Sequence, residues 1–246
     1  MRAMILAAGL GTRLRPLTND RPKALVEING RTLLEITLAR LRGFEIREVI
    51  VNVHHFADMV VDYLKANDNF GMWIEISREE VLLDTGGGLK KAAHFFLADE
   101  SGEHFLLHNV DVLSSIDFER MVQLHLESGA LATLAVQERA SSRQLLFDED
   151  EGLCGRKAEG ESVEITPSAP QCHPLAFCGI HVISRRIFSL LTEEGVFPIV
   201  PAYLQLAAQG ENILGFRADE YSWRDLGTVE NVRRAASDPD LTALPR

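Results

Sequence analysis

Residues 4–23, "MILAAGLGTRLRPLTNDRPK", join a short apolar run to two glycines and several basic side chains. Gly9 and Gly11 follow the run directly, and glycine lets backbone N–H groups approach phosphate oxygens closely. Arg13 and Lys23 then supply positive charge within a short length of chain. Many strand-to-helix turns use glycine only to turn, but the added basic residues favour a site for a phosphorylated anion.

Two acidic residues stand at the ends of later apolar segments. Asp111 follows "HFLLHNV", and Asp225 lies within "WRDLGT". Two carboxylates brought together from distant parts of a chain suit Mg²⁺, which binds one or two carboxylates together with phosphate oxygens and waters. An aspartate near a strand end also serves as a helix cap or turn residue, so position alone leaves both interpretations open.

Apolar periodicity indicates the elements that must position these residues. Extended runs, rich in β-branched residues, alternate with segments that repeat apolar residues at intervals of three and four. The alternation predicts an α/β fold with a mostly parallel sheet, helices on both faces and ligands beyond the carboxyl ends of the strands. Strands are predicted at 3–8, 48–53, 73–77, 104–113, 131–136, 176–184, 212–219 and 222–228, and helices at 32–44, 55–67, 87–98, 116–128, 185–191, 199–210 and from about 229.

Composition narrows the class of ligand. The chain has 25 Lys and Arg against 36 Asp and Glu, a formal charge of −11, yet its charges are partly segregated, because basic residues outnumber acidic ones in the first 31 positions and acidic residues dominate later. This distribution favours a small anionic substrate over a nucleic acid. No apolar run approaches the ~20 residues that span a bilayer, which predicts a cytoplasmic protein with no membrane partner. The three cysteines predict neither a disulfide framework nor a zinc site, and unpaired thiols are expected.

The glycine-rich stretch and several later motifs together resemble the sugar-phosphate nucleotidyltransferases. They are "LAAGLGTRLRPLT…RPKALVEI", "LLDTGGGLKKA", "LLHNVDVL", "FCGIHVIS" and "WRDLGT", in the order and spacing of that family. The likeness covers roughly residues 1–232 and is strongest to the short, single-domain uridylyl- and guanylyltransferases. It implies a Rossmann-like, GT-A-like domain over 1–232, with an edge excursion at 139–174 near the acceptor site and a C-terminal tail at 233–246.

The resemblance also implies roles for individual residues. Backbone groups of Ala8, Gly9 and Gly11 would cradle a triphosphate, Arg13 would hold its β- and γ-phosphates, and Lys23 would lie across the reacting phosphates. Asp111 would act in catalysis and, with Asp225, bind Mg²⁺. The remaining assignments are Thr85, Gly86 and Gly87 in a loop at the nucleobase, and Asn109, Glu164 and Gly179 at the sugar.

The sequence departs from the family pattern at three places, one of them, Asp84, in the loop expected at the nucleobase and the other two on the acceptor side. Val110 stands where glycine is common, and its side chain is expected to narrow the pocket beside Asn109. Asp84 replaces another glycine. The usual Glu-Lys-Pro element is missing, so Glu164 is the substitute expected for a sugar hydroxyl and Lys157 for the cation.

The implied reaction is Mg²⁺-dependent transfer of a nucleotidyl group from an NTP, with UTP or GTP favoured, to a sugar 1-phosphate. A phosphocholine-type cytidylyltransferase and a non-catalytic regulatory subunit remain alternatives. Retention of Arg13, Lys23, Asp111 and Asp225 disfavours the regulatory subunit, and a scarcity of aromatic residues at 139–184 disfavours choline. The sequence leaves a homodimer open.

Overall fold

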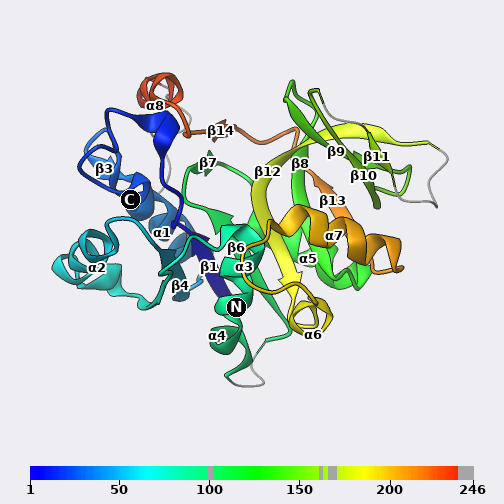
Figure 1. Ribbon diagram of the computed structural model, residues 1–246, viewed down its shortest axis with the longest axis horizontal. Helices are drawn as coiled ribbons and strands as arrows, with labels where there is room; N and C mark the ends of the chain where they lie inside the picture. Colours follow the sequence, from blue (N-terminus) through cyan, green and yellow to red (C-terminus); the bar gives the residue numbers. More distant parts are fainter. Residues whose placement is uncertain (99–101, 161–162, 166–170, 238–246) are drawn as a thin grey trace.

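The computed structural model describes residues 1–98, 102–160, 163–165 and 171–237, and a large mixed sheet organises them (Figure 1). The strand order is β11-β10-β9-β12-β6-β1-β4-β5, with β8 pairing β12 and β13. The strands of this sheet are β1 (Arg2–Leu6), β4 (Glu48–Val53), β5 (Trp73–Arg78), β6 (His104–Asn109), β8 (Ala132–Gln137), β9 (Arg143–Phe147), β10 (Leu153–Ala158), β11 (Glu164–Ile165), β12 (His173–Ser184) and β13 (Ile213–Arg217).

Two small antiparallel pairs and a set of helices complete the described structure. The pairs join β2 (Glu27–Ile28) to β3 (Arg31–Thr32), and β7 (Val112–Ser114) to β14 (Trp223–Asp225). The α-helices are α1 (Leu33–Gly43), α2 (Ala57–Ala66), α3 (Asp84–Lys91), α4 (Ala93–Leu97), α5 (Phe118–Ser128), α6 (Ile187–Leu190), α7 (Ile199–Ala208) and α8 (Val229–Ala236). Short 3₁₀ helices are η1 (Thr12–Leu14), η2 (Lys23–Leu25) and η3 (Asp68–Gly71).

The part of the sheet that contains β1 and its neighbours is parallel. β1 pairs in parallel with β4 on one side and β6 on the other, and β4 pairs in parallel with β5. The loops that follow β1, β4, β5 and β6 therefore emerge at one edge of the sheet. This confirms the predicted α/β, mainly parallel fold, with antiparallel pairing added where β12 meets β6 and β8.

Side-chain alternation along β1 divides the core between the two faces of the sheet. Ala3 and Ile5 belong to one buried cluster, which contains Leu38 of α1 and Met121 of α5. Met4 and Leu6 belong to the other, with residues of α3, α4 and α7. Because successive strand residues point to opposite faces, both faces of this apolar strand need helices to cover them.

Three helices begin at residues whose side chains cap the helix N-terminus. Thr32 Oγ1 accepts from the Glu35 N–H at 3.1 Å, Asp117 caps α5 through the Glu119 and Arg120 N–H groups, and Thr228 caps α8. Such caps satisfy N–H groups that have no partner within the helix. The predicted helix over 87–98 is instead two helices, α3 and α4, which meet at Ala92.

The described part of residues 139–174 forms β9, β10 and β11 at the edge of the large sheet (Figure 1). Residues 161–162 and 166–170 of this excursion lie outside the described residues. At the other end of the chain, α8 continues to Ala236, so the expected boundary at 232 falls inside a helix. Residues 238–246 of the expected tail also lie outside the described part.

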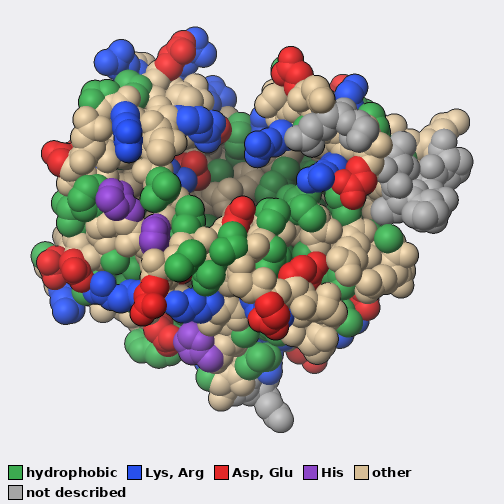
Figure 2. Space-filling model, in the orientation of Figure 1, with side chains coloured by type: hydrophobic (Ala, Val, Ile, Leu, Met, Phe, Trp, Pro, Cys, Tyr) green, Lys and Arg blue, Asp and Glu red, His purple; other side chains and the backbone are tan. Residues whose placement is uncertain are grey.

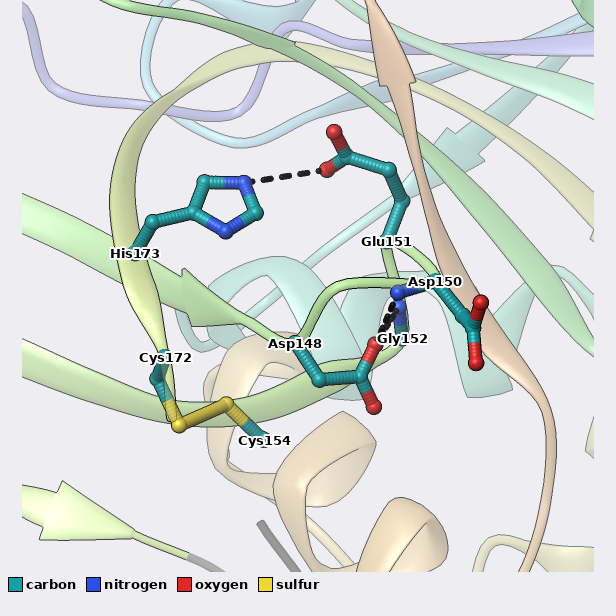
Figure 3. Close-up of a disulfide and its surroundings, with 7 residues drawn as sticks. All are labelled: Asp148, Asp150, Glu151, Gly152, Cys154, Cys172 and His173. Atoms are coloured by element: carbon teal, nitrogen blue, oxygen red, sulfur yellow. Dashed lines mark hydrogen bonds and ion pairs between the residues drawn. A yellow bond between two sulfur atoms is a disulfide. The ribbon is translucent and has the colours of Figure 1, made fainter. Parts of the chain in front are cut away.

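The prediction that all cysteines are unpaired is wrong for two of them. Cys154 of β10 and Cys172, which precedes β12, form a disulfide with Cα atoms 6.9 Å apart (Figure 3). An odd number of cysteines excludes complete pairing but not one local bridge, and the sheet brings these two segments together through β9. Cys178 is free and buried, and burial raises the pKa of its thiol to about 12. No helix in the described chain is long and apolar enough to span a membrane.

Candidate active site

The glycine-containing segment after β1 folds against Lys23. A Cβ built on Gly9 would lie 3.5 Å from Lys23 Nζ, so the lysine tip reaches back over this backbone. Gly11 has φ of +63°, a left-handed conformation that glycine adopts without strain. Its carbonyl accepts a hydrogen bond from Thr18 Oγ1 at 2.8 Å. The segment therefore returns on itself and places a cation next to the loop predicted to hold phosphates.

Lys23 forms an ion pair with Asp111. Lys23 Nζ lies 2.9 Å from Asp111 Oδ2, and the two side chains are only 15% and 14% exposed. Asp111 follows β6, the strand beside β1, so parallel pairing delivers it to the edge where the glycine segment begins. The structure thus brings together three of the sequence-predicted elements: the glycine loop, Lys23 and Asp111.

Asp225 approaches Asp111 through the β7–β14 pair. Asp225 pairs in register with Val112, and the Leu226 N–H donates to the Asp111 carbonyl at 2.8 Å. The Asp225 side chain is oriented by the Gly227 N–H, which donates to its Oδ1 at 2.7 Å. The pairing of β14 with β7 therefore brings the backbone at Asp225 beside the backbone at Asp111.

Arg13 reaches the same region from the glycine segment. A Cβ built on Gly227 would lie 2.7 Å from Arg13 Nη2 and 2.8 Å from Asp225 Oδ1. The Arg13 guanidinium and the Asp225 carboxylate therefore converge on Gly227, where a side chain would displace them. Within the described residues, no cluster of three or more His, Cys, Asp or Glu could hold a metal without help from a ligand. Two carboxylates plus phosphate oxygens are the donor set that suits Mg²⁺.

A cleft of about 360 Å³ opens beside these residues. Figure 2 shows the face hollowed between the part that carries β3 and α1 and the part that carries β9 and β12. The cleft contains charges of both signs, with Lys23 facing acidic side chains. Its lining is Leu6, Ala8, Gly9, Lys23, Asn52, Glu79, Leu82, Asp84, Thr85, Asn109, Asp111 and Val196.

On the acceptor side, Gly179 makes room for Asn109. Gly179 has φ of +73°, and a Cβ on it would lie 2.7 Å from Asn109 Nδ2. It falls in the irregular stretch where the register of β12 against β8 shifts between Phe177 and His181. Val110 does not narrow the cleft as expected, because its side chain is 1% exposed and packs in the core.

The expected nucleobase loop at 84–87 is the first turn of α3. The N–H groups of Gly86 and Gly87 both donate to the Phe197 carbonyl, at 3.0 and 3.1 Å, and are not directed at a ligand. Thr85 Oγ1 accepts from the Ile199 N–H at 2.9 Å, although Thr85 still lines the cleft. These two N–H groups are therefore used in packing α3 against the segment before α7, and a role of this turn at the nucleobase stays a prediction.

Glu164 is not part of the cleft lining. It lies on β11, the outermost strand of the sheet, four places from β6 in the strand order. Its Oε2 accepts from Arg156 Nε at 2.7 Å. Glu164 and Lys157, on the adjacent β10, are therefore both outside the cleft lining, and their predicted roles at the sugar stay predictions.

Two buried polar residues of the cleft have no counterpart in the sequence prediction. Asn52 ends the pairing of β4 with β1, and Glu79 follows β5. Asn52 Nδ2 donates to Glu79 Oε1 at 2.7 Å, and both side chains are nearly inaccessible to solvent. Their position in the sequence could have indicated a place at the site, because both are polar residues at the carboxyl ends of predicted parallel strands, where ligands bind.

A second unpredicted contact lies near Asp225. The Arg139 guanidinium stacks 3.8 Å from the Trp223 ring centroid and donates to the Phe177 carbonyl at 2.9 Å. Trp223 Nε1 donates to the Cys178 carbonyl at 2.8 Å. A guanidinium over an aromatic face is a favourable cation–π arrangement, and here it covers one face of the indole.

Comparison with known proteins identifies the family of the chain. The family description "Nucleotidyl transferase" matches residues 2–240. The chain belongs to the nucleotidyl transferase family. Among curated relatives of this nucleotidyl transferase, N-acetylmuramate alpha-1-phosphate uridylyltransferase of Caulobacter vibrioides is 35% identical over 92% of the chain and 91% of the relative. Probable mannose-1-phosphate guanylyltransferase 3 of Oryza sativa subsp. japonica is also 35% identical, over 92% of the chain but 61% of the relative.

Solved structures support the fold assignment of the nucleotidyl transferase. The crystal structure of HddC from Yersinia pseudotuberculosis complexed with GMP-PN superposes with a TM-score of 0.76 at 20% identity, covering 96% of this chain and 98% of that one. A putative glucose-1-phosphate thymidylyltransferase from Bacillus anthracis, in complex with a sucrose, gives 0.78 at 16% identity, covering 96% and 94%. At these identities the likeness establishes the fold alone.

Proposed function

We propose that this nucleotidyl transferase uses an NTP and a sugar 1-phosphate to make an NDP-sugar and pyrophosphate. The observation that carries the proposal is the Lys23–Asp111 ion pair, which lines the cleft together with Ala8 and Gly9. A cation beside a phosphate loop, with a carboxylate at hydrogen-bonding distance, suits a reaction between two phosphate groups. The names of curated relatives at 35% identity support both substrate classes.

In the proposed reaction, an oxygen of the sugar 1-phosphate attacks the α-phosphorus of the NTP. A new P–O bond forms as the bond to the bridging oxygen of the β-phosphate breaks, and pyrophosphate leaves with the electron pair. The attacking phosphate is already ionised, so no general base is needed. Lys23 would offset charge on the reacting phosphates, and Arg13 would bind the β- and γ-phosphates.

Asp111, which lines the cleft, and Asp225, which ends the adjacent strand β14, make a cation necessary in this proposal. Asp111 and Asp225 would repel a triphosphate unless a positive ion lay between them and its oxygens. Their donor set fits Mg²⁺, which would be held by these two carboxylates and would neutralise phosphate charge. The Lys23 ammonium would then turn from Asp111 towards the phosphates.

The contact between Arg139 and Trp223 favours a sugar phosphate over phosphocholine. A quaternary ammonium is normally recognised by open aromatic faces. The Trp223 ring is already covered by the Arg139 guanidinium at 3.8 Å, which would also repel a second cation. We propose UTP ahead of GTP as donor, because the relative covered almost completely is a uridylyltransferase.

Pyrophosphate release tests the proposal directly. Four NTPs are crossed with a panel of hexosamine, hexose and heptose 1-phosphates and with phosphocholine, each with Mg²⁺ and with EDTA. We expect Mg²⁺-dependent release with UTP and at least one sugar 1-phosphate, and none with phosphocholine. Release only with CTP and phosphocholine, or no release in any combination, would overturn the proposed function.

A further inference from the structure

A buried asparagine holds the start of the glycine segment. The Ala7 N–H donates to Asn52 Oδ1 at 2.7 Å, directly before Ala8 and Gly9 of the cleft lining. Leu6 and Asn52 are the last residues in register between β1 and β4. The Asn52 side chain therefore takes over from the strand pairing and fixes the direction in which the chain leaves the sheet.

The same asparagine connects this segment to the opposite wall of the cleft. Asn52 Nδ2 donates to Glu79 Oε1 at 2.7 Å, and Glu79 Oε2 accepts from the Leu83 N–H at 2.9 Å. Asn52 is 2% and Glu79 4% exposed. Because Asn52 Oδ1 must face the Ala7 N–H, the NH₂ end of the same amide faces Glu79. The Glu79 carboxylate then accepts one hydrogen bond on each of its two oxygens.

Helix α3 closes over this pair at a glycine. A Cβ on Gly88 would lie 2.8 Å from Glu79 Oε1 and 2.9 Å from Asn52 Nδ2. Gly88 is the last glycine of the "DTGGG" motif, and its lack of a side chain lets the helix backbone rest on the buried pair. One hydrogen-bonded chain, Ala7–Asn52–Glu79–Leu83, thus spans the segments that form two walls of the cleft.

We propose that Asn52 and Glu79 are positioning residues for the nucleotide. They set the distance between the glycine segment and the segment 79–85, and so the width of the space into which an NTP fits. This inference rests on the proposed function, because it requires that the cleft binds an NTP. A cleft that already has the required width before the NTP binds favours both affinity and in-line reaction. A small displacement of the loop that holds the phosphates lowers the reaction rate strongly.

Exchanging the two functional groups tests the proposal. Asn52→Asp alone places a second carboxylate against Glu79. Glu79→Gln alone turns one of the two acceptor oxygens into an NH₂ group, which must then face either the Asn52 NH₂ or the Leu83 N–H, both of which are donors. Combining both substitutions restores every contact. The new carboxylate at position 52 would accept from the Ala7 N–H and from the new amide at position 79, whose oxygen would accept from the Leu83 N–H. The double variant Asn52→Asp/Glu79→Gln should therefore recover what each single change loses.

The measurements are NTP binding by calorimetry and steady-state kinetics with each substrate varied. Each single variant is expected to weaken NTP binding and lower kcat/KM for the NTP by about ten- to a hundredfold, with KM for the sugar 1-phosphate within about twofold. The double variant should return to within about threefold of wild type. If a single variant does not fold, the NTP affinity of the double variant still tests the proposal, which expects it to lie within about threefold of the wild-type value.

Thr37→Val provides the matched control, since Thr37 is buried and donates to the Leu33 carbonyl of α1 at 2.9 Å, away from the cleft lining. It should lower the melting temperature without changing NTP affinity. Single variants that lose stability but bind NTP normally would overturn the positioning role, as would a double variant no better than either single one. Absence of NTP binding in wild type would instead overturn the proposed function, and the inference with it.

Discussion

Asp111 has more than one partner at the site. Its Oδ2 lies 2.9 Å from Lys23 Nζ, and its carbonyl accepts from the Leu226 N–H next to Asp225. The backbone contact anchors the residue, so its side chain can exchange Lys23 for another cation without moving the strand. A partly buried carboxylate at such a position interacts strongly with charged ligands, because surrounding protein screens the charges less than water does.

Asp111→Asn and Asp225→Asn are each expected to reduce turnover by roughly 100-fold or more, on the scale of removing one electrostatic stabiliser. Each substitution keeps the side-chain shape and removes a charge proposed to hold Mg²⁺. Pyrophosphate release measures the loss, and circular dichroism checks the fold. Asp62→Asn, an exposed change on α2, is the charge-matched control. Turnover within about threefold of wild type would remove that aspartate from the proposed metal site.

Lys23→Ala is expected to lower kcat more than it raises KM for the NTP. The lysine charge is most useful when both substrates are bound and negative charge shifts towards the leaving group. In the free enzyme Lys23 is paired with Asp111, so part of its interaction with an NTP is offset by loss of that pair. Kinetics at varied NTP concentration separate the two effects, with exposed Lys65→Ala as control. A raised KM with unchanged kcat would contradict this role.

At the scale of elements, the "DTGGG" motif serves the packing of α3. A side chain on Gly86 would overlap the Phe197 ring, with the Phe197 carbonyl 2.9 Å away, and one on Gly87 would meet the Gly195 carbonyl. Gly88 rests on the Asn52–Glu79 pair. The three glycines thus let α3 approach its neighbours from several directions, despite the unfavourable intrinsic helix propensity of glycine.

Gly86→Ala is accordingly expected to destabilise the fold by about 1–3 kcal/mol, the usual range for overpacking a tight contact. Urea unfolding followed by tryptophan fluorescence measures the change. Phe197→Leu should destabilise when made alone but recover part of the loss when combined with Gly86→Ala, because the smaller side chain leaves room for the new methyl group. Strict additivity of the two changes would mean that they do not meet.

The sequence predicted the elements whose periodicity is strong and missed features that depend on tertiary contacts. The apolar strands of the parallel sheet and the helices α1, α2 and α5 fall close to their predicted ranges. Of the motif residues predicted to act in the site, Lys23 and Asp111 form an ion pair, and Asp225 lies on the strand that pairs with the segment after Asp111. The role of the glycines in α3 was missed because their neighbour, Phe197, is more than a hundred residues away.

Strand order explains why Glu164 lies away from the cleft. Glu164 was chosen by chemical type from a segment that lacks the family element, but residue type carries no information on which edge of a sheet a strand occupies. β11 pairs only with β10 in the described structure, and this places Glu164 at the outer edge. Asn52 was missed because it is a polar residue in a largely apolar strand. Its partners come from the segments that follow β1 and β5, which the periodicity of β4 does not indicate.

At the scale of the whole molecule, the core contains three histidines. His108, His125 and His181 are each at most 3% exposed. Burial lowers the pKa of His108 to about 4, with a further contribution from Arg40. Burial also lowers the pKa of His125 to about 4 and that of His181 to about 3. Their hydrogen bonds, such as His181 Nδ1 to the Tyr203 hydroxyl at 2.9 Å, are those of neutral imidazoles in a packed interior.

These lowered pKa values predict a loss of stability on mild acidification. In the unfolded chain each histidine takes up a proton near its usual pKa of 6.5, whereas the folded protein does not until about pH 4. Below pH 6.5 the unfolded state therefore binds more protons, and the free energy of unfolding falls with pH, by at most about 4 kcal/mol per pH unit for three groups. Paired carboxylates add to this only below about pH 5, so the interval from pH 6.5 to 5 isolates the histidines.

Urea unfolding at several pH values between 7.5 and 5 measures this slope. His125→Gln should reduce the slope by about the contribution of one proton, because it removes one buried imidazole. Glutamine is chosen because it can keep a hydrogen bond to Thr133 Oγ1, which lies 3.0 Å from His125 Nδ1. His94→Gln is the matched control, because His94 is exposed on α4 and its substitution removes no buried imidazole. A free energy of unfolding that stayed constant from pH 7.5 to 5 would show that the buried histidines gain protons in the folded protein as readily as in the unfolded chain.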